Sequence, residues 1–193
     1  MTLELPPNGQ LGEACISETT VTYSDVLESL MDSASTGFPF HVQEGKYKRL
    51  HVRGVLQMSN TRMERVTNLQ FVLEARGKVL VAGLGMGYVL TQILPKPEVK
   101  HVTVIEKSAD VVKLVAPHFA CDKLRVLIDD IHRWRPSEKF HVIYFDIWPN
   151  VSLKNLPEMA KLHRRFRQFL LPGGYLNSWS REGLLKMKKR GLE

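Results

Sequence analysis

The chain has 193 residues and a formal net charge of +7, with 44% hydrophobic and 24% charged residues, a composition ordinary for one globular domain. No apolar run approaches the roughly 18 residues of a membrane span, and the N-terminal residues lack the basic and then apolar form of a signal peptide. Two cysteines are too few for a disulfide framework or a zinc site. We therefore expect a cytoplasmic protein with no membrane association and no bound metal.

The first 60 residues are expected to form an N-terminal arm and a β-hairpin, which precede a main domain at 61–193. Consecutive prolines near the N-terminus mark the arm as loose. A short helix is predicted at 24–31. Residues 40–52 alternate in polarity on either side of a Glu-Gly-Lys turn and predict the hairpin, which residues 55–58 extend.

A helix is predicted to begin after Thr61 and to end before Gly77. Thr61 and Glu64 have the spacing of a capping box, in which the hydroxyl and the carboxylate each accept a hydrogen bond from a backbone N–H of the first turn. Apolar residues follow at helical spacing, namely Met63, Val66, Leu69, Val72 and Leu73.

Beyond this helix, apolar runs rich in β-branched residues alternate with helical segments. Strands are predicted at 78–82, 101–105, 124–128, 140–145 and 174–179, and helices at 86–94, 108–117 and 157–170. The alternation predicts an α/β fold, a Rossmann-like, doubly wound and mostly parallel sheet with helices on both faces. Because 13 residues follow Ser180, we expect the sheet to be short at its C-terminal end. Its edge strand is expected to be covered by the N-terminal arm or by a second copy in a homo-oligomer.

The turn after the first of these strands carries three glycines, Gly83, Gly85 and Gly87. Glycines let the backbone turn sharply and approach a ligand closely. Glu106 ends the next strand, where a nucleotide-binding unit places the carboxylate that holds the ribose hydroxyls. A dinucleotide site would have its third glycine at the position of Tyr88. The earlier glycine, together with Glu106, favours S-adenosylmethionine as the cofactor, because no phosphate links its adenosine to its amino acid.

Acidic and aromatic residues follow the next two strands, at the edge where ligands of such sheets bind. Asp129, Asp130 and Ile131 follow the third strand. Either carboxylate can accept a hydrogen bond from the adenine amino group while Ile131 packs on the ring, or the aspartate can cap the next turn. Asp146 and Trp148 follow the fourth strand and predict a substrate site, in which Trp148 stacks on a cationic substrate or packs in the core. A metal held by the three aspartates is the weaker alternative.

Two basic runs, at 163–167 and 186–190, raise the question of nucleic acid, since either can follow a phosphate backbone. Solvated helix faces explain such runs more often. Phe166 and Phe169, the aromatics beside them, have the spacing of a core-facing stripe rather than of a stacking platform. A small-molecule partner is therefore favoured over nucleic acid.

Over about residues 61–180, these motifs resemble the class I S-adenosylmethionine-dependent methyltransferases. Within that class, the motif at 62–65 (Arg-Met-Glu-Arg), the glycine turn, Tyr-Phe-Asp-Ile-Trp-Pro at 144–149 and Leu-Pro-Gly-Gly at 171–174 resemble guanidinoacetate methyltransferase. This resemblance implies that Met63 lies beside the cofactor and that Asp146 holds the guanidino group of the substrate.

A weaker resemblance is to the spermidine synthases, through Gly-Val-Leu-Gln at 54–57 and the aspartate of the fourth strand. It implies that Gln57 contacts the cofactor. Pro149 stands where those enzymes have a further acid, so methyl transfer is favoured over aminopropyl transfer. The sequence thus predicts a methyltransferase acting on a small amine or guanidine, with Asp146 orienting and deprotonating the nitrogen. An aminopropyltransferase and a cofactor-binding partner protein without its own chemistry are the alternatives.

Overall fold

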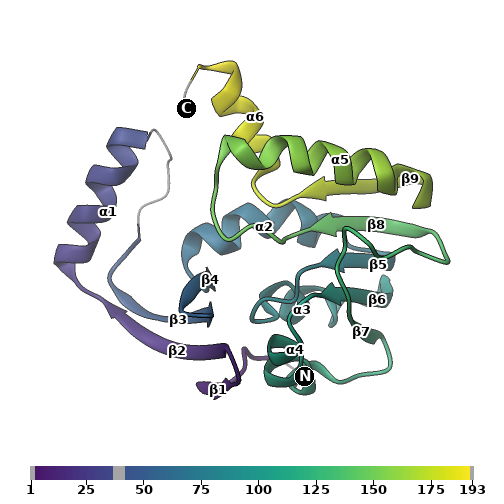
Figure 1. Ribbon diagram of the computed structural model, residues 1–193, viewed down its shortest axis with the longest axis horizontal. Helices are drawn as coiled ribbons and strands as arrows, with labels where there is room; N and C mark the ends of the chain where they lie inside the picture. Colours follow the sequence, from purple (N-terminus) through teal and green to yellow (C-terminus); the bar gives the residue numbers. More distant parts are fainter. Residues whose placement is uncertain (1–2, 37–41, 192–193) are drawn as a thin grey trace.

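The computed structural model describes residues 3–36 and 42–191. Its N-terminal part is an antiparallel sheet with the strand order β1-β2-β3-β4. The strands are β1 (Gly9–Leu11), β2 (Ala14–Val21), β3 (Gly45–Val52) and β4 (Val55–Ser59), and helix α1 (Tyr23–Thr36) lies between β2 and β3 in the chain. Figure 1 shows α1 projecting from the end of the β2–β3 pair.

The predicted hairpin is confirmed in part, because its turn lies elsewhere. The turn between β3 and β4 is formed by Arg53 and Gly54, both with positive φ. The expected turn at 44–46 is wrong: Gly45 begins β3, which pairs with β2 along its length. Of the predicted strand at 40–42, Val42 is described and is not in a strand, and the rest lies outside the described residues. Strand β2 escaped prediction because its middle, Ser-Glu-Thr-Thr, is polar.

The main sheet is parallel and has the order β7-β6-β5-β8-β9. Its strands are β5 (Gly77–Ala82), β6 (Val99–Glu106), β7 (Leu124–Ile128), β8 (Phe140–Phe145) and β9 (Leu170–Ser178), and its helices are α2 (Arg62–Glu74), α3 (Tyr88–Ile93), α4 (Ala109–Val115), α5 (Leu156–Phe166) and α6 (Arg181–Lys189). The order reverses between β5 and β8, as in a doubly wound sheet. The predicted Rossmann-like α/β fold is confirmed.

Strand β9 begins four residues before its predicted start, because the Pro-Gly-Gly segment lies inside the strand rather than before it. Phe140 pairs with Leu170, but Val142 already pairs with Tyr175, so residues 171–174 form a bulge. Among the described residues, no strand other than β8 pairs with β9. The N-terminal arm does not cover this edge, since its β1 pairs with β2 in the other sheet.

Helices cover both faces of the parallel sheet (Figure 1). Tyr144 and Phe145 are neighbours in β8 and therefore point to opposite faces. Tyr144 stacks on Phe71 of α2 with ring centroids 4.1 Å apart. Phe145 meets Phe166 of α5 edge-on at 5.2 Å. Every second residue of β8, counted from Tyr144, thus points to the face that α2 covers. The next such position after Tyr144 is Asp146.

Helix α2 confirms the predicted element but not its capping box. The Thr61 side chain makes no capping hydrogen bond. The Glu64 side chain turns inward instead, where its Oε1 accepts a hydrogen bond of 3.1 Å from Asn68 Nδ2. The buried residues of α2 are Glu64, Asn68 and Phe71. Its exposed large apolar residues are Val66, Leu69 and Leu73. The helix therefore buries two polar side chains and turns most of its predicted apolar stripe outward.

The first basic run is divided between structural and exposed side chains. His163 is buried, and its Nε2 lies 2.7 Å from Ser178 Oγ. Burial lowers the pKa of His163 to about 4, so the ring is neutral at neutral pH. The Arg165 guanidinium donates hydrogen bonds to three backbone carbonyls in the loop that follows β7, those of Ile131, His132 and Trp134. Arg164 and Arg167 of this run are exposed.

None of the helices within the described residues is both long enough and apolar enough to cross a membrane.

Candidate functional site

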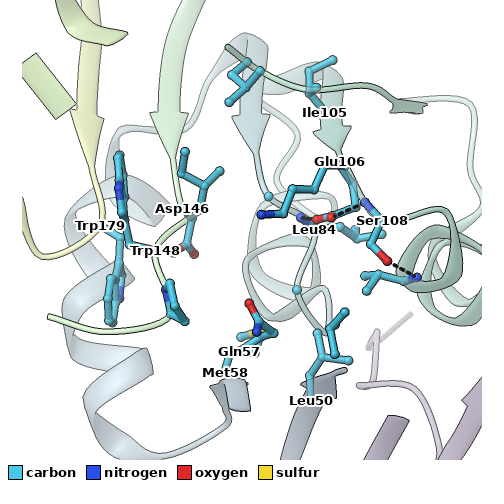
Figure 2. Close-up of a pocket in the computed structure, with 18 of the residues that line it drawn as sticks. Leu50, Gln57, Met58, Leu84, Ile105, Glu106, Ser108, Asp146, Trp148 and Trp179 are labelled. Atoms are coloured by element: carbon cyan, nitrogen blue, oxygen red, sulfur yellow. Dashed lines mark hydrogen bonds between the residues drawn. The ribbon is translucent and has the colours of Figure 1, made fainter. Parts of the chain in front are cut away.

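A cleft of about 1280 Å³ opens at the carboxyl ends of the parallel strands, between them and the antiparallel sheet. It lies where the strand order reverses between β5 and β8, the position at which doubly wound sheets bind ligands. In Figure 2, Asp146, Trp148 and Trp179 lie on one side of the cleft and Glu106 and Ser108 on the other, with Gln57, Met58 and Leu50 facing them from the antiparallel sheet.

The glycine turn approaches its neighbours so closely that larger residues do not fit. A Cβ on Gly83 would lie 2.0 Å from the carbonyl oxygen of Asp146, and one on Gly85 would lie 2.2 Å from Met58 Sδ. Both glycines have positive φ and line the cleft. Gly87 precedes α3 and packs on the Phe119 ring, outside the cleft lining. The structure therefore brings two of the three predicted glycines to the site.

The substitution Gly83→Ala is expected to destabilise the fold strongly, because the clash is with backbone. We expect a loss of about 1–2 kcal/mol from the left-handed conformation and a further loss of about 1–3 kcal/mol from overpacking. Gly54→Ala is the matched control, since Gly54 also has positive φ but a Cβ added there would have no atom within 4 Å. Urea unfolding of both variants checks this. Equal losses would show that the contact with Asp146 relaxes freely.

Glu106 joins the glycine turn to the turn after β6. Its Oε2 accepts a hydrogen bond of 2.9 Å from the Leu84 N–H, and its Oε1 accepts one of 2.9 Å from the Ser108 N–H (Figure 2). A carboxylate has about four lone-pair positions, so both oxygens keep acceptor capacity for a ligand. Glu106 lines the cleft as predicted. It also supports the two loops on which a cofactor would rest.

Asp129, Asp130 and Ile131 all line the cleft. The Asp130 carboxylate accepts a hydrogen bond of 2.9 Å from the His132 N–H, which closes the turn after β7 and lowers the pKa of Asp130. The capping role weighed for this aspartate is therefore present. Ile131 is buried and offers an apolar wall beside it.

The antiparallel sheet and the start of α2 supply the opposite wall, which includes Gln57 and Met63. Gln57 Nε2 donates only a local hydrogen bond of 3.2 Å to the Val55 carbonyl. Met58, which sequence reasoning missed, places its Sδ 2.9 Å from the Met86 nitrogen in the glycine turn. β4 thereby positions the turn as well as lining the cleft.

Two acids, Glu64 and Asp146, line the cleft and are close enough for the charge of Asp146 to act on Glu64. Glu64 is 4% exposed, and Asp146 is partly buried. Burial raises the pKa of Asp146 to about 7. Burial, and then the charge of Asp146, raise the pKa of Glu64 well above its ordinary value. No ion pair among the described residues gives either acid a basic partner. A site of this kind favours a cation that enters from outside.

The substitution Asp146→Asn is expected to stabilise the fold at high pH. The pKa of Asp146 is higher in the fold than in the unfolded chain. The free energy of unfolding of the wild type therefore falls as the pH rises from about 4 through 7, and asparagine removes this loss. At pH 5 the carboxyl is still protonated in the fold, so the gain is smaller than at pH 8. Thermal unfolding at pH 5 and pH 8 measures the difference. A variant less stable than the wild type at both values would contradict a desolvated acid.

Two tryptophans, Trp148 and Trp179, line the cleft on the side of Asp146 (Figure 2). Trp148 is 8% exposed, and its Nε1 donates to Glu158 Oε2 at 2.5 Å. Trp179 is held by a hydrogen bond of 2.9 Å from its Nε1 to Thr67 Oγ1. Trp148 is therefore packed in the core, as one of its two predicted roles requires, and it also lines the cleft; its stacking on a cationic substrate stays a prediction.

Sequence reasoning missed Glu64 and Trp179 as site residues, for different reasons. Trp179 directly follows β9, so the rule that ligands bind at the carboxyl ends of strands could have found it. Glu64 lies on a helix, and its spacing from Thr61 pointed to a cap instead. In the part of the chain that the structure describes, no His, Cys, Asp or Glu side chains form a group that could hold a metal, so Asp129, Asp130 and Asp146 do not gather as ligands.

Fold and cleft together define a Rossmann-like α/β protein with its site at the switch point of the sheet. No protein-family model matches the chain, and no curated protein matches it. Among solved structures, the spermidine synthase from Thermotoga maritima is similar at a TM-score of 0.50 and 14% identity, over 78% of this chain and 60% of that chain.

Two further solved structures are similar at lower TM-scores. The DhpI–SAH complex has a TM-score of 0.48 and 20% identity, over 60% of this chain and 55% of that chain. The N-methyltransferase NodS from Bradyrhizobium japonicum WM9 has a TM-score of 0.48 and 16% identity, over 67% of this chain and 79% of that chain. The chain thus spans 55% of the length of DhpI and 60% of the spermidine synthase. At these identities the likeness concerns the fold alone.

Proposed function

We propose that the protein is an S-adenosylmethionine-dependent methyltransferase whose acceptor is a small amine or guanidine. The observation that carries the proposal is a pair of acids, the buried Glu64 and the partly buried Asp146, which line a cleft at the switch point of the sheet and have raised pKa values. Gly83, Gly85 and Glu106 line the same cleft and support the choice of cofactor.

The cleft fits the proposed cofactor in size and chemistry. Its volume of about 1280 Å³ exceeds the roughly 300–1,000 Å³ usual for small-molecule sites, so a cofactor and a small acceptor can occupy it together. Glu106 would hold the ribose hydroxyls, and the backbone at Gly83 and Gly85 would lie against the amino-acid end. Asp130 and Ile131 would hold the adenine. When bound, the cofactor supplies an activated methyl group.

The acid pair would bind and orient the acceptor. Two neighbouring carboxylates in a poorly solvated site disfavour a second negative charge. An ammonium or guanidinium relieves that repulsion and donates charge-assisted hydrogen bonds to both acids. With a pKa near 7, Asp146 can also take up the proton that the nitrogen loses on methylation. Trp148 and Trp179 would shield the pair from water and stack on the cation.

A turnover assay tests the proposal. The purified chain is incubated with methyl-labelled S-adenosylmethionine and, separately, with amines, guanidines, a neutral alcohol panel and RNA. Label is expected in an amine or guanidine. Transfer to RNA or to an alcohol alone would overturn the acceptor class. Transfer to none, with cofactor binding intact by calorimetry, would favour the cofactor-binding partner protein.

Aminopropyl transfer is the second candidate, favoured by the structural likeness to a spermidine synthase at the level of the fold. Pro149 lines the cleft three positions after Asp146 and brings no carboxylate to that point. A diamine would therefore have Glu64 and Asp146 for one ammonium and no third acid there for the other. Adding an aminopropyl donor and a diamine to the same assay separates the two reactions.

A further inference from the structure

Helix α1 carries an exposed apolar face that the rest of the described chain leaves uncovered. Tyr23, Leu27, Leu30 and Met31 are 65%, 44%, 41% and 74% exposed, and their spacing places them along one side of the helix. The helix has 14 residues and stands apart from the parallel sheet (Figure 1). Isolated helices shorter than about 12–15 residues are marginal in water, so α1 needs a surface to pack against.

Helix α2 offers a second exposed apolar surface, here named the α2 ridge, made of Val66, Leu69 and Leu73. These residues are 43%, 52% and 65% exposed. They are one helical turn apart, so they form a continuous ridge on the outer side of α2. Such a ridge on a helix whose inner side carries polar site residues is poorly explained by the fold of one chain alone.

The charges beside the two surfaces are opposite. Asp25 and Glu28 are exposed on α1, and no Lys or Arg lies between Tyr23 and Met31. Arg62 and Arg65 are exposed beside the α2 ridge. No ion pair within residues 3–36 and 42–191 involves Glu28 or either arginine. If α1 packed against the α1 of a second copy, the acids of the two helices would repel each other. If α2 packed against α2, the arginines would repel each other.

We propose that two copies of the chain form a symmetric dimer in which α1 of each copy packs on the α2 ridge of the other. This arrangement buries both apolar surfaces and pairs the acids of α1 with the arginines of α2. It is isologous, because the same two contacts occur twice about a two-fold axis, and it closes without leading to a filament. Since the inner side of α2 carries Glu64, the partner's α1 braces the helix that holds one acid of the site.

The arrangement fits the position of α1 in the chain. Strands β2 and β3 are paired up to Val21 and Gly45, so α1 sits at the free end of a two-stranded ribbon. A helix at the end of a ribbon can reach beyond its own subunit, whereas helix α2 lies beside the parallel sheet (Figure 1).

Size-exclusion chromatography with light scattering tests the proposal on the full chain. The wild type is expected to be a dimer at micromolar concentration. Variant one, Leu27→Glu with Leu30→Glu, alters α1, and variant two, Leu69→Glu with Leu73→Glu, alters the ridge. Each alone is expected to be a monomer. An equal mixture is expected to form dimers again, because the intact α1 of variant two can pack on the intact ridge of variant one.

The two variants, alone and mixed, distinguish this dimer from dimers in which like helices pack on each other. If α1 packed on α1, variant two, whose α1 is intact, would stay dimeric by itself. If the ridges packed on each other, variant one, whose ridge is intact, would stay dimeric by itself. A monomeric wild type, or a mixture that stays monomeric while both variants keep the wild-type melting temperature, would overturn the proposal. Lys188→Glu with Lys189→Glu on α6 is the control for added acidity and is expected to remain dimeric.

A milder pair of variants covers the case in which two glutamates unfold a helix. Arg65→Glu is expected to weaken the dimer at least tenfold, and adding Glu28→Arg in the same chain is expected to restore most of the affinity. Failure of the second change to restore it, in a chain that dimerises as the wild type, would contradict the pairing of α1 with α2.

Discussion

Replacing Asp146 with asparagine is expected to lower turnover by about 10²–10⁴-fold while leaving cofactor affinity nearly unchanged. Asp146 follows β8, and its backbone N–H is held by the Ala82 carbonyl at 2.7 Å, so the side chain is placed by the sheet rather than by a mobile loop. Asparagine keeps the shape and can still contact an acceptor nitrogen. It can neither neutralise a cation nor take up its proton.

The measurement is kcat and KM on the acceptor identified by the assay, with cofactor binding followed by calorimetry. The wild-type rate should fall as the pH drops below about 7, where Asp146 becomes protonated, and the variant should lose that dependence. Glu64→Gln is the informative companion, because Glu64 would bind the acceptor while Asp146 takes up its proton: KM should rise more than kcat falls. Wild-type turnover by Asp146→Asn would mean that this acid only closes the turn before Pro149.

Replacing Glu106 with alanine is expected to weaken cofactor binding by at least tenfold. Charge-assisted hydrogen bonds are worth about 1.5–3 kcal/mol each, and the ribose would lose such bonds. The variant also frees the Leu84 and Ser108 N–H groups that Glu106 now holds. Part of the loss therefore reflects a looser glycine turn, and the melting temperature should fall as well.

Calorimetry with S-adenosylmethionine and its demethylated product measures this effect. Glu98→Ala is the matched control, since Glu98 is an exposed acid just before β6, away from the cleft lining. At saturating cofactor, Glu106→Ala should retain much of its turnover, the reverse of Asp146→Asn. Unchanged affinity in Glu106→Ala would place the ribose elsewhere and remove the main support for the cofactor site.

The sequence by itself determined the parallel sheet and most of the residues that line the cleft at its edge. An apolar run rich in β-branched residues is typical of a strand buried on both faces. The ends of β5 to β8 could therefore be predicted to within one or two residues. Glycines at positive φ and acids directly after strands are also local features. That is why Gly83, Gly85, Glu106, Asp130 and Asp146 could be placed at one edge from the order of residues alone.

Only the tertiary structure decided which side of α2 faces inward. Periodicity shows that a helix has two faces, and it cannot show which face the rest of the fold will cover. Here the inner face meets Tyr144 and Asp146 of β8, so a carboxylate and an amide are buried and Val66, Leu69 and Leu73 are left outside. Glu64 and Asp146 are 82 positions apart in the chain, and they come near each other because this face of α2 is the one that packs inward. The acid pair, and with it the proposed preference for a cationic acceptor, is therefore a property of packing rather than of any motif.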